Sequence, residues 1–182
     1  MTPLVDSYIE LLKEYNSHTN VYSKSTYDQL AFHIQDSINV AGLVSECGDR
    51  VVDLGSGSGL PSVIIAIHNP HQKVVALESK ERKRRFLQWV KDELGLVNYE
   101  VYSGDIQMFK HHRNDMCGAV TAKAFAKAPK VLQVARGLAC KKGRLVIPVS
   151  KNQFGLLPKA ISRFGREVEV AGVVFNYIVH PL

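Results

Sequence analysis

Hydrophobic and polar positions repeat with two different periods between residues 51 and 150. Short runs rich in β-branched residues predict strands, and longer segments with apolar residues three or four positions apart predict helices. The expected strands cover residues 51–53, 73–78, 99–102, 118–122 and 144–149, and the expected helices cover 61–68, 82–94 and 128–138. Because strands and helices alternate, we expect a parallel sheet with helices on both faces, joined by right-handed crossovers.

The two ends of the chain show other patterns. Residues 5–16 and about 25–44 carry apolar positions at helical spacing, so they are predicted to be helices of an N-terminal cap. Residues 153–164 are typical of a broken helix, and 167–174 and 175–182 are predicted to be two strands joined by a turn. We expect these two strands to pair antiparallel at one edge of the sheet.

These patterns together predict a Rossmann-like α/β fold with a seven-stranded, mostly parallel sheet. Neither an internal repeat nor a linker interrupts the pattern, and 182 residues are enough to bury one core. The expected organisation is a single domain over residues 1–182, with the helical cap at 1–46 and the α/β core at 47–182.

The composition narrows the class of protein. The longest apolar runs are far too short to cross a bilayer, and the first residues lack the pattern of a secretory signal. Three widely spaced cysteines fit neither a disulfide framework nor a zinc site. We therefore expect a cytoplasmic monomer without a bound metal or a membrane partner. The formal net charge of +6 is mildly basic, and its distribution matters more than its total.

A glycine-rich stretch, "VVDLGSGSGLP", follows the first predicted strand of the core. Gly55, Gly57 and Gly59 lack a Cβ, so a ligand can approach the backbone there, and free N–H groups of a following helix point outward. The dinucleotide fingerprint would need a third glycine where Leu60 stands, and Asp53 would lie poorly beside a pyrophosphate. Both features argue against a nucleotide-dependent oxidoreductase, the first alternative.

Acidic residues end three successive strands of the predicted sheet. Asp53 is placed to attract a cationic group, Glu78 to accept both hydroxyls of a ribose, and Asp105 to reach an adenine edge. With no lysine or arginine in the loop, this pattern predicts S-adenosylmethionine, which carries a sulfonium and an ammonium and no phosphate. The alternative is that the carboxylates only cap turns or face solvent. The residues of this segment expected to bind the cofactor are Asp53, Gly55, Ser56, Gly57, Gly59, Leu60, Glu78, Ser79 and Asp105.

Positive charge gathers where the next helix begins, in "SKERKRRF". Cations in a first helical turn oppose the helix dipole, at a cost of a few tenths of a kcal/mol to about 1 kcal/mol each. A phosphate-rich partner would explain this arrangement, and its affinity should fall steeply with salt. A surface that only confers solubility is the alternative. The basic cluster comprises Lys80, Arg82, Lys83, Arg84 and Arg85, and Lys123, Lys127 and Lys130 are expected to reach the same edge of the sheet.

No order of cysteine, serine, histidine and aspartate in the chain indicates nucleophilic or acid–base catalysis. His33 shares a predicted helix face with Asp36 and Ser37. A hydrogen bond on the helix surface is the simpler interpretation of that spacing.

From about Leu11 to Pro148 the chain resembles the RsmG/GidB family of bacterial methyltransferases. "EYNSHTN" is similar to the family's W-N-x-x-x-N-L-T, "FHIQDSI" to its R-H-x-x-D-S-L, and "VVDLGSGSGLPSVIIAI" to its D-V-G-S-G-x-G-F-P-G-I-x-L-A-I. "ESKERKRRFL" is similar to its D-S-x-x-K-K-x-x-F-L, and "TAKAFA" to its T-S-R-A-F-A. The glycine loop is common to many methyltransferases, whereas the H-x-x-D-S and G-x-P elements are much more specific.

The resemblance implies a class I methyltransferase fold and assigns further site residues. It implies that Gly55 and Leu60 contact the cofactor, and that Ile106 and Gln107 border the adenine. Lys123 stands where the family has an arginine of the binding site, and lysine cannot form the planar two-pronged contact of arginine. Departures from the family pattern include Tyr15 for tryptophan, Val21 for leucine, Phe32 for arginine and Lys123 for arginine.

The resemblance further implies an enzyme that methylates N7 of a guanine in 16S ribosomal RNA with S-adenosylmethionine. Guanine N7 has a free lone pair and loses no proton when methylated. Positioning of the two substrates can therefore supply most of the rate acceleration. Lys123 is the only candidate catalytic residue. The base must be unpaired or flipped, in naked RNA or in the small ribosomal subunit. The expected RNA contacts are His33, Lys80, Arg82, Lys83, Arg85, Lys123 and Lys127.

Two further alternatives stay open at this point. The substitution at Lys123 is compatible with an RNA-binding factor that kept the fold without the activity. A methyltransferase of another RNA or of a small molecule is also possible, and a small-molecule substrate would need no basic cluster.

Overall fold

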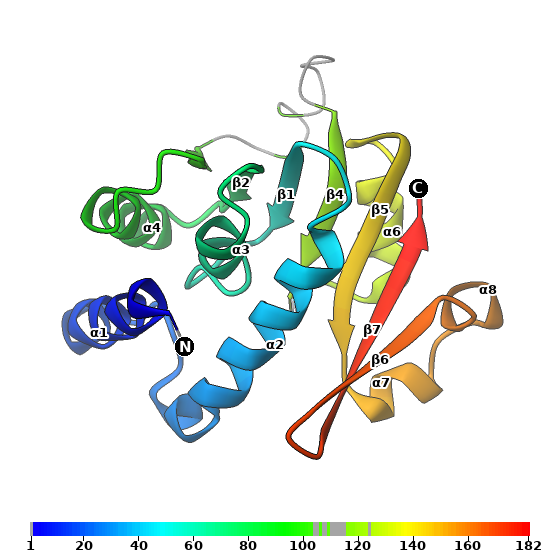
Figure 1. The fold of residues 1–182 in the computed structure, drawn as a ribbon, viewed down its shortest axis with the longest axis horizontal. Helices are drawn as coiled ribbons and strands as arrows, with labels where there is room; N and C mark the ends of the chain where they lie inside the picture. The colour runs from blue at the N-terminus through cyan, green and yellow to red at the C-terminus, as the bar shows by residue number, and fades with distance from the viewer. Residues whose placement is uncertain (1, 104–105, 107–108, 110–115, 124) are drawn as a thin grey trace.

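The computed structural model describes residues 2–103, 106, 109, 116–123 and 125–182. Seven strands form one sheet in the order β3-β2-β1-β4-β5-β7-β6 (Figure 1). The first five strands of this order (β3, β2, β1, β4 and β5) pair in parallel. Strand β7 pairs antiparallel with β5 and with β6. The strands are β1 (Arg50–Leu54), β2 (Lys73–Leu77), β3 (Tyr99–Tyr102), β4 (Cys117–Ala122), β5 (Ala139–Val149), β6 (Gly165–Val170) and β7 (Val173–Pro181).

The helices lie where the hydrophobic pattern places them. The prediction of one helix over about 25–44 is only partly right, because its first turns form a 3-10 helix, η1, before α2 begins. The described helices are α1 (Pro3–His18), η1 (Lys24–Gln29), α2 (Leu30–Val44), α3 (Ser62–His68), α4 (Glu81–Glu93), α6 (Ala128–Ala135), α7 (Lys151–Gly155) and α8 (Lys159–Ser162). The mostly parallel α/β fold with a helical N-terminal segment is thus confirmed.

The C-terminal hairpin corrects one predicted boundary. We expected the turn after residue 174, but it consists of Ala171 and Gly172, between the paired residues Val170 and Val173. Both turn residues have positive φ, 50° and 78°, as a two-residue hairpin loop with the twist of its strands requires. The valines on either side of the short Ala-Gly pair hid this turn in the hydrophobic pattern.

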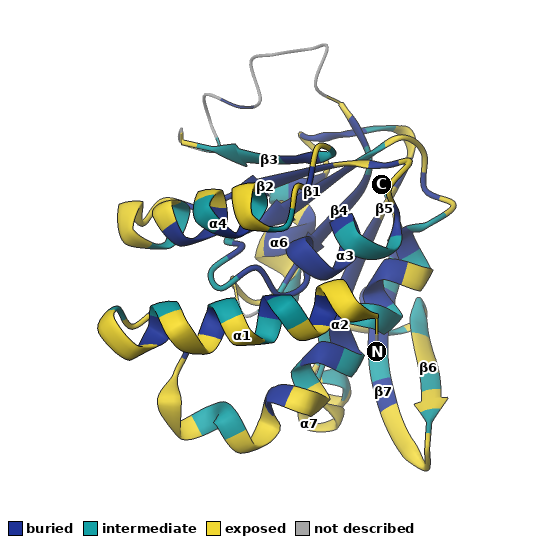
Figure 2. Ribbon diagram, turned by 60° about the vertical axis from the view of Figure 1, so that its left-hand side comes forward, coloured by how far each residue is buried: buried dark blue, intermediate teal, exposed yellow. Residues whose placement is uncertain are grey.

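Two layers of helices cover the sheet and form two hydrophobic cores. On one face, α1, α2, α3 and α4 pack on residues such as Val51 and Val74; on the other face, α6 and α8 pack on residues such as Val52 and Val75. Figure 2 shows the alternation of buried and exposed positions along α1 and α2 that this packing requires. Because both faces are covered, the central strands are apolar at successive positions. None of the helices in the described ranges combines the length and the apolar character needed to span a membrane.

Side-chain hydrogen bonds of Asn16 and Tyr8 hold the N-terminal helices in place. The Asn16 side chain accepts hydrogen bonds from the N–H groups of Val21 (2.8 Å) and Tyr22 (3.0 Å) and holds the turn after α1. The hydroxyl of Tyr8 donates to the carbonyl of Ser58 over 2.6 Å. Since Ser58 lies in the glycine-rich segment, α1 directly supports the loop that begins the candidate site.

Candidate functional site

The glycine loop, residues 55–59, joins β1 to the segment that leads into α3. Gly55, Gly57 and Gly59 have φ values of 70°, 60° and 90°, in the left-handed region that glycine adopts without steric cost. A Cβ atom at Gly59 would lie only 2.6 Å from Cγ2 of Val63. The loop therefore requires glycine for its path and for its close packing on α3.

Asp53, the fourth residue of β1, carries the least compensated charge of the site. Its side chain is 1% exposed, and neither carboxylate oxygen has a hydrogen-bond partner within the described part of the chain. Burial raises the pKa of this carboxyl to about 6. Buried carboxylates are normally paired, so this position beneath the glycine loop suits a ligand that brings a positive charge.

Glu78, directly after β2, ties the loop to the start of α4. Its Oε2 accepts a hydrogen bond from the N–H of Gly57 over 2.9 Å, and its Oε1 accepts one from the N–H of Lys80 over 2.8 Å. A carboxylate offers about four acceptor positions. Glu78 thus keeps acceptor capacity for the two hydroxyls of a ribose while it stays fixed in place.

A cavity of about 470 Å³ adjoins the loop and Glu78, and we call it the loop cavity. The structure places four predicted cofactor residues on its wall: Gly55, Glu78, Ser79 and Ile106. Asp53, Ser56 and Gly59 are buried beneath or within the loop, and Leu60, 7% exposed, follows it. The predicted residues Asp105 and Gln107 lie outside the described residues.

Phe125 and Arg84 also line the loop cavity, although the sequence did not assign them to the cofactor. The Phe125 ring packs on Gly55 so closely that a Cβ there would lie 2.8 Å from its Cδ2. Arg84 donates hydrogen bonds to the backbone carbonyls of Glu78 and Ser79, so it supports the cavity wall. The aromatic residue in "TAKAFA", two positions past Lys123 at the end of β4, is the sequence signal that identifies Phe125.

The basic cluster lies at the amino end of α4, beside the same loop. Arg85 pairs with Glu81 over 2.6 Å, and both side chains are exposed. Lys83 Nζ lies 3.6 Å from the position that a Cβ on Gly57 would take. Among the described residues, Arg85 is the only member of the cluster in an ion pair. Most of the positive charge at this edge is therefore not neutralised by carboxylates of the described residues.

Lys123 follows β4 and lies inside the molecule rather than on the exposed edge with α4. Its Nζ is 2.8 Å from Oδ2 of Asp36, and Oδ1 of Asp36 accepts a hydrogen bond from the Tyr177 hydroxyl over 2.9 Å. These three side chains, Lys123, Asp36 and Tyr177, connect β4 to α2 and β7. Lys123 and Asp36 line a second cavity, of about 680 Å³, between α2 and the β6–β7 hairpin, which we call the hairpin cavity.

His33 lines the same hairpin cavity. The predicted hydrogen bond on the helix surface forms between Ser37, which donates over 2.7 Å, and the backbone carbonyl of His33, whereas the His33 ring has another partner: its Nδ1 lies 2.7 Å from the Tyr22 hydroxyl. Burial lowers the pKa of the imidazole, and the ammonium of Lys123 lowers it further. The ring therefore offers hydrogen bonds rather than a positive charge near neutral pH.

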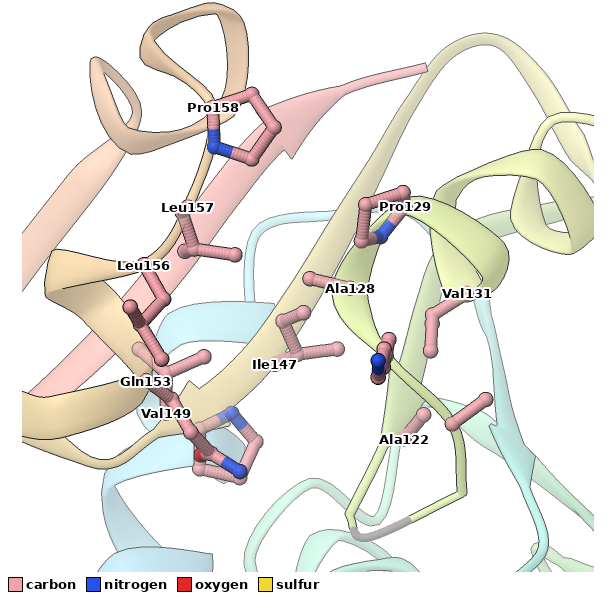
Figure 3. Close-up of a pocket in the computed structure, with 13 residues that line it drawn as sticks. Ala122, Ala128, Pro129, Val131, Ile147, Val149, Gln153, Leu156, Leu157 and Pro158 are labelled. Atoms are coloured by element: carbon pink, nitrogen blue, oxygen red, sulfur yellow. The ribbon is translucent and has the colours of Figure 1, made fainter.

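A third cavity, of about 480 Å³, has a mostly apolar wall. Figure 3 shows Pro129 and Val131 of α6 on one side, Leu156, Leu157 and Pro158 of the α7–α8 segment on the other, and Ile147 of β5 between them. Lys127, a predicted RNA contact, lies at its border, exposed before the first turn of α6.

Comparison with known proteins identifies the family. The family model described as GidB, rRNA small subunit methyltransferase G, matches residues 1–154. The chain is 34% identical to the ribosomal RNA small subunit methyltransferase G of Syntrophomonas wolfei over 172 residues, which are 92% of this chain and 74% of that protein. It is 32% identical to the protein of the same name from Nitrosococcus oceani over 141 residues, 77% of this chain. The match spans 64% of the Nitrosococcus protein and 66% of the one from Laribacter hongkongensis.

Solved structures share the fold at low sequence identity. A methyltransferase from Geobacter sulfurreducens superposes with a TM-score of 0.63 at 18% identity, covering 98% of this chain and 89% of that one. An O-methyltransferase from Bacillus cereus, solved in complex with SAH, superposes with a TM-score of 0.68 at 12% identity, covering 98% and 90%. The sheet order, the glycine loop and the matched sequence together lead to one conclusion: this chain belongs to the GidB family, the rRNA small subunit methyltransferase G proteins.

Proposed function

We propose that the chain transfers a methyl group from S-adenosylmethionine to N7 of a guanine in 16S ribosomal RNA. Membership of the GidB family supports the reaction class and the RNA substrate. The observation in the structure that carries the proposal is the buried Asp53 carboxylate beneath the glycine loop, without a hydrogen-bond partner in the described part of the chain.

The residues around the loop fit this methyl donor. The Asp53 carboxylate would pair with the ammonium of its methionine moiety, Glu78 would accept its ribose hydroxyls, and the loop cavity would hold its adenosine. The flat Phe125 ring and the backbone at Gly55 offer surfaces for an aromatic base. Ile106, on the wall of the loop cavity, supports the proposed adenine contacts of this segment, to which Asp105 and Gln107 also belong.

When bound, the donor supplies a methyl carbon on a sulfonium: the N7 lone pair forms the new C–N bond as the C–S bond breaks, and the positive charge passes to the base. The protein then has no proton to remove, which agrees with the absence of a base–nucleophile pair among the described side chains of the site. Its residues have to hold N7 in line and exclude competing orientations. Lys123, fixed by Asp36, is the proposed positioning residue.

The basic cluster supports binding of the RNA backbone. Lys80, Arg82 and Lys83 lie at the amino end of α4 without an ion-pair partner among the described residues, beside the loop that would hold the donor. Phosphate contacts of this kind position an RNA without reading its sequence. The proposed set is completed by His33, Arg85, Lys123 and Lys127.

The proposal includes the organisation of the chain. The cap at 1–46 and the core at 47–182 both line the hairpin cavity, which supports one functional domain. We propose that it acts as a monomer on the small ribosomal subunit or its RNA, in the cytoplasm where ribosomes are assembled.

Methyl transfer tests the proposal directly. Purified protein, radiolabelled S-adenosylmethionine and small ribosomal subunits from cells that lack this protein should yield labelled 16S RNA, with one modified guanine on mapping. Asp53→Asn should lower the labelling at least tenfold, whereas the exposed Asp28→Asn should not change it. Failure of the wild-type protein to label either RNA or subunits, while it binds the donor, would refute the proposed function.

A further inference from the structure

We propose that the hairpin cavity is the site of the acceptor guanine, with Phe32 as its stacking surface and Glu167 as the acceptor for its N1–H and N2–H₂ groups. The inference rests on the proposed function and adds to it the residues that select guanine. Phe32 and Glu167 both line this cavity, from α2 and from β6.

The hairpin cavity is next to the glycine loop in the sheet. β1 and β4 pair in parallel with Leu54 opposite Ala122, so Gly55 and Lys123 leave the sheet side by side. Lys123 lines the hairpin cavity, and its ammonium acts electrostatically on both His33 and Asp53. Ligands of open α/β sheets bind at this carboxyl edge of the strands. A base in the hairpin cavity therefore adjoins a donor held by the loop.

The cavity offers a flat apolar surface. The rings of Phe32 and Phe175 are stacked, with centroids 4.8 Å apart and an interplanar angle of 20°. Phe175 is 4% exposed, whereas Phe32 is 47% exposed. A large apolar side chain left half open beside a cavity is a typical stacking surface for an unpaired base. Phe32 stands where the family pattern has an arginine, so this surface is a property of this chain.

The polar groups of the cavity match guanine and not adenine. Lys123 has three donor positions, of which Asp36 takes one, so it can donate to the O6 acceptor beside N7. Glu167 forms no ion pair with a described residue, and its carboxylate matches the neighbouring N1–H and N2–H₂ donors. Adenine would present an amino group to Lys123 and an acceptor nitrogen to Glu167. Lys151, also on the cavity wall, suits the phosphate of the same nucleotide.

The Glu167 carboxylate also fits the charge of the product. Methylation at N7 gives the guanine ring a positive charge and needs no proton transfer. Of the two acidic side chains on the described wall of the cavity, Asp36 is paired with Lys123, whereas Glu167 forms no ion pair with a described residue. Fixed negative charge beside a ring that becomes positive stabilises the transition state more than the neutral base. Glu167 therefore contributes to rate as well as to selection.

Glu167 lies outside the part of the chain that the family model matches, which ends at residue 154. It belongs to the β6–β7 hairpin, where Glu167 pairs with Asn176 and Glu169 pairs with Val174. Both glutamates are exposed, but only Glu167 is among the described residues that line the cavity. Glu169→Gln is therefore a matched control for Glu167→Gln, with the same charge change on the same strand.

The test combines protein and substrate changes. The guanosine that the wild-type protein methylates is mapped first. Small subunits are then reconstituted with RNA that carries inosine at that position. Inosine keeps N7, O6 and N1–H but lacks the N2 amino group. We expect inosine to lower kcat/KM of the wild type and of Glu169→Gln about tenfold. For Glu167→Gln, kcat/KM on guanosine should be about tenfold below wild type, and inosine should lower it less than twofold further, because the contact to N2–H₂ that inosine lacks is already weakened in this variant.

The stacking surface is tested with a pair of variants at position 32. Phe32→Leu should raise KM for the small subunit at least fivefold, and Phe32→Tyr should restore it within twofold. The Kd for S-adenosylmethionine, measured by titration calorimetry, should stay within twofold of wild type in all variants, which shows that they are folded and bind the donor.

The outcomes separate the two proposals. A full inosine penalty in Glu167→Gln, or unchanged kinetics in both Glu167→Gln and Phe32→Leu, would overturn the assignment of the cavity while methyl transfer to guanosine by the wild type upholds the proposed function. A wild-type protein that binds the donor and methylates no guanosine would overturn both.

Discussion

At the scale of single residues, the site is built around one carboxylate whose ionised form the fold does not favour. Asp53 is buried without a hydrogen-bond partner among described residues, and its pKa is raised to about 6 by burial. Its neighbour at the site, Glu78, has two backbone N–H donors instead. The protein thus keeps one carboxylate under the glycine loop without a hydrogen-bond partner among the described residues, and the Lys123 ammonium offsets its charge only in part, which favours a cationic ligand.

Asp53→Asn should therefore stabilise the ligand-free protein while it weakens donor binding. Because the folded-state pKa is above the unfolded value, the protonated form is favoured by folding. Ionisation of Asp53 lowers the free energy of unfolding. This loss is absent below about pH 4, grows as the pH rises to about 6 and is complete above it. At pH 8 we expect the variant to gain about 2–3 kcal/mol in the free energy of unfolding by urea. At pH 4 the gain should vanish; an equal gain at both pH values would contradict the assignment.

The same carboxyl predicts a pH dependence of donor affinity. Below about pH 6, protonation of Asp53 removes the charge that we propose pairs with the ammonium of S-adenosylmethionine, so the Kd should rise about tenfold for each unit by which the pH falls further. Titration calorimetry between pH 5 and 8 measures this dependence. Asp53→Asn should give a weak and nearly flat profile, and the exposed Asp28→Asn should follow the wild type.

At the scale of elements, α2 is held against the sheet by a polar group rather than by apolar contact alone. Asp36 of α2 binds Lys123 after β4 and Tyr177 of β7, and Asn39 donates to the same tyrosine hydroxyl over 3.1 Å. Three elements that are distant in the sequence thus meet on the wall of the hairpin cavity. A buried group of this kind fixes orientation more than it adds stability.

Tyr177→Phe should weaken the junction that Asp36, Lys123 and Tyr177 form between α2, β4 and β7. The change leaves an acceptor of Asp36 unpaired in a buried position, which we expect to cost about 1–2 kcal/mol in the free energy of unfolding. The kcat/KM on the small subunit should fall more than the donor affinity, because the contact orients Lys123 and not the glycine loop. Tyr102→Phe is the control, since the Tyr102 hydroxyl has no hydrogen-bond partner within the described residues. Equal effects of the two variants would argue against the junction.

At the scale of the whole molecule, charge and cavities are arranged along one edge of the sheet. The glycine loop, Lys123 and the basic cluster of α4 follow the carboxyl ends of β1, β4 and β2. Lys141 and Lys142 lie near the amino end of β5, at the opposite edge. The net charge of +6 is therefore less informative than the fact that one edge combines an acidic loop site with a cationic border.

Charge reversal at that border should affect RNA and not the donor. Arg82→Glu combined with Arg85→Glu should weaken binding of 16S RNA at least tenfold. Each phosphate contact that is lost should also reduce the slope of log affinity against log salt by about 0.7–0.9. Affinity for S-adenosylmethionine should not change. Lys141→Glu serves as the control at the opposite edge, and an equal loss of RNA affinity there would contradict a localised RNA surface.

The sequence by itself determined the fold class and the order of the elements, and it predicted the proposed donor side of the site. Strand and helix periods are local properties, and the motif from Asp53 to Leu60 is contiguous, so pattern and spacing suffice to predict them. The tertiary structure decided what depends on contacts between distant segments. The pairing of Asp36 with Lys123, the packing of Phe125 on Gly55, and the cavity that joins Phe32 to Glu167 arise only when α2, β4 and the β6–β7 hairpin meet. No local pattern encodes such contacts, because long-range packing sets the distances between their side chains.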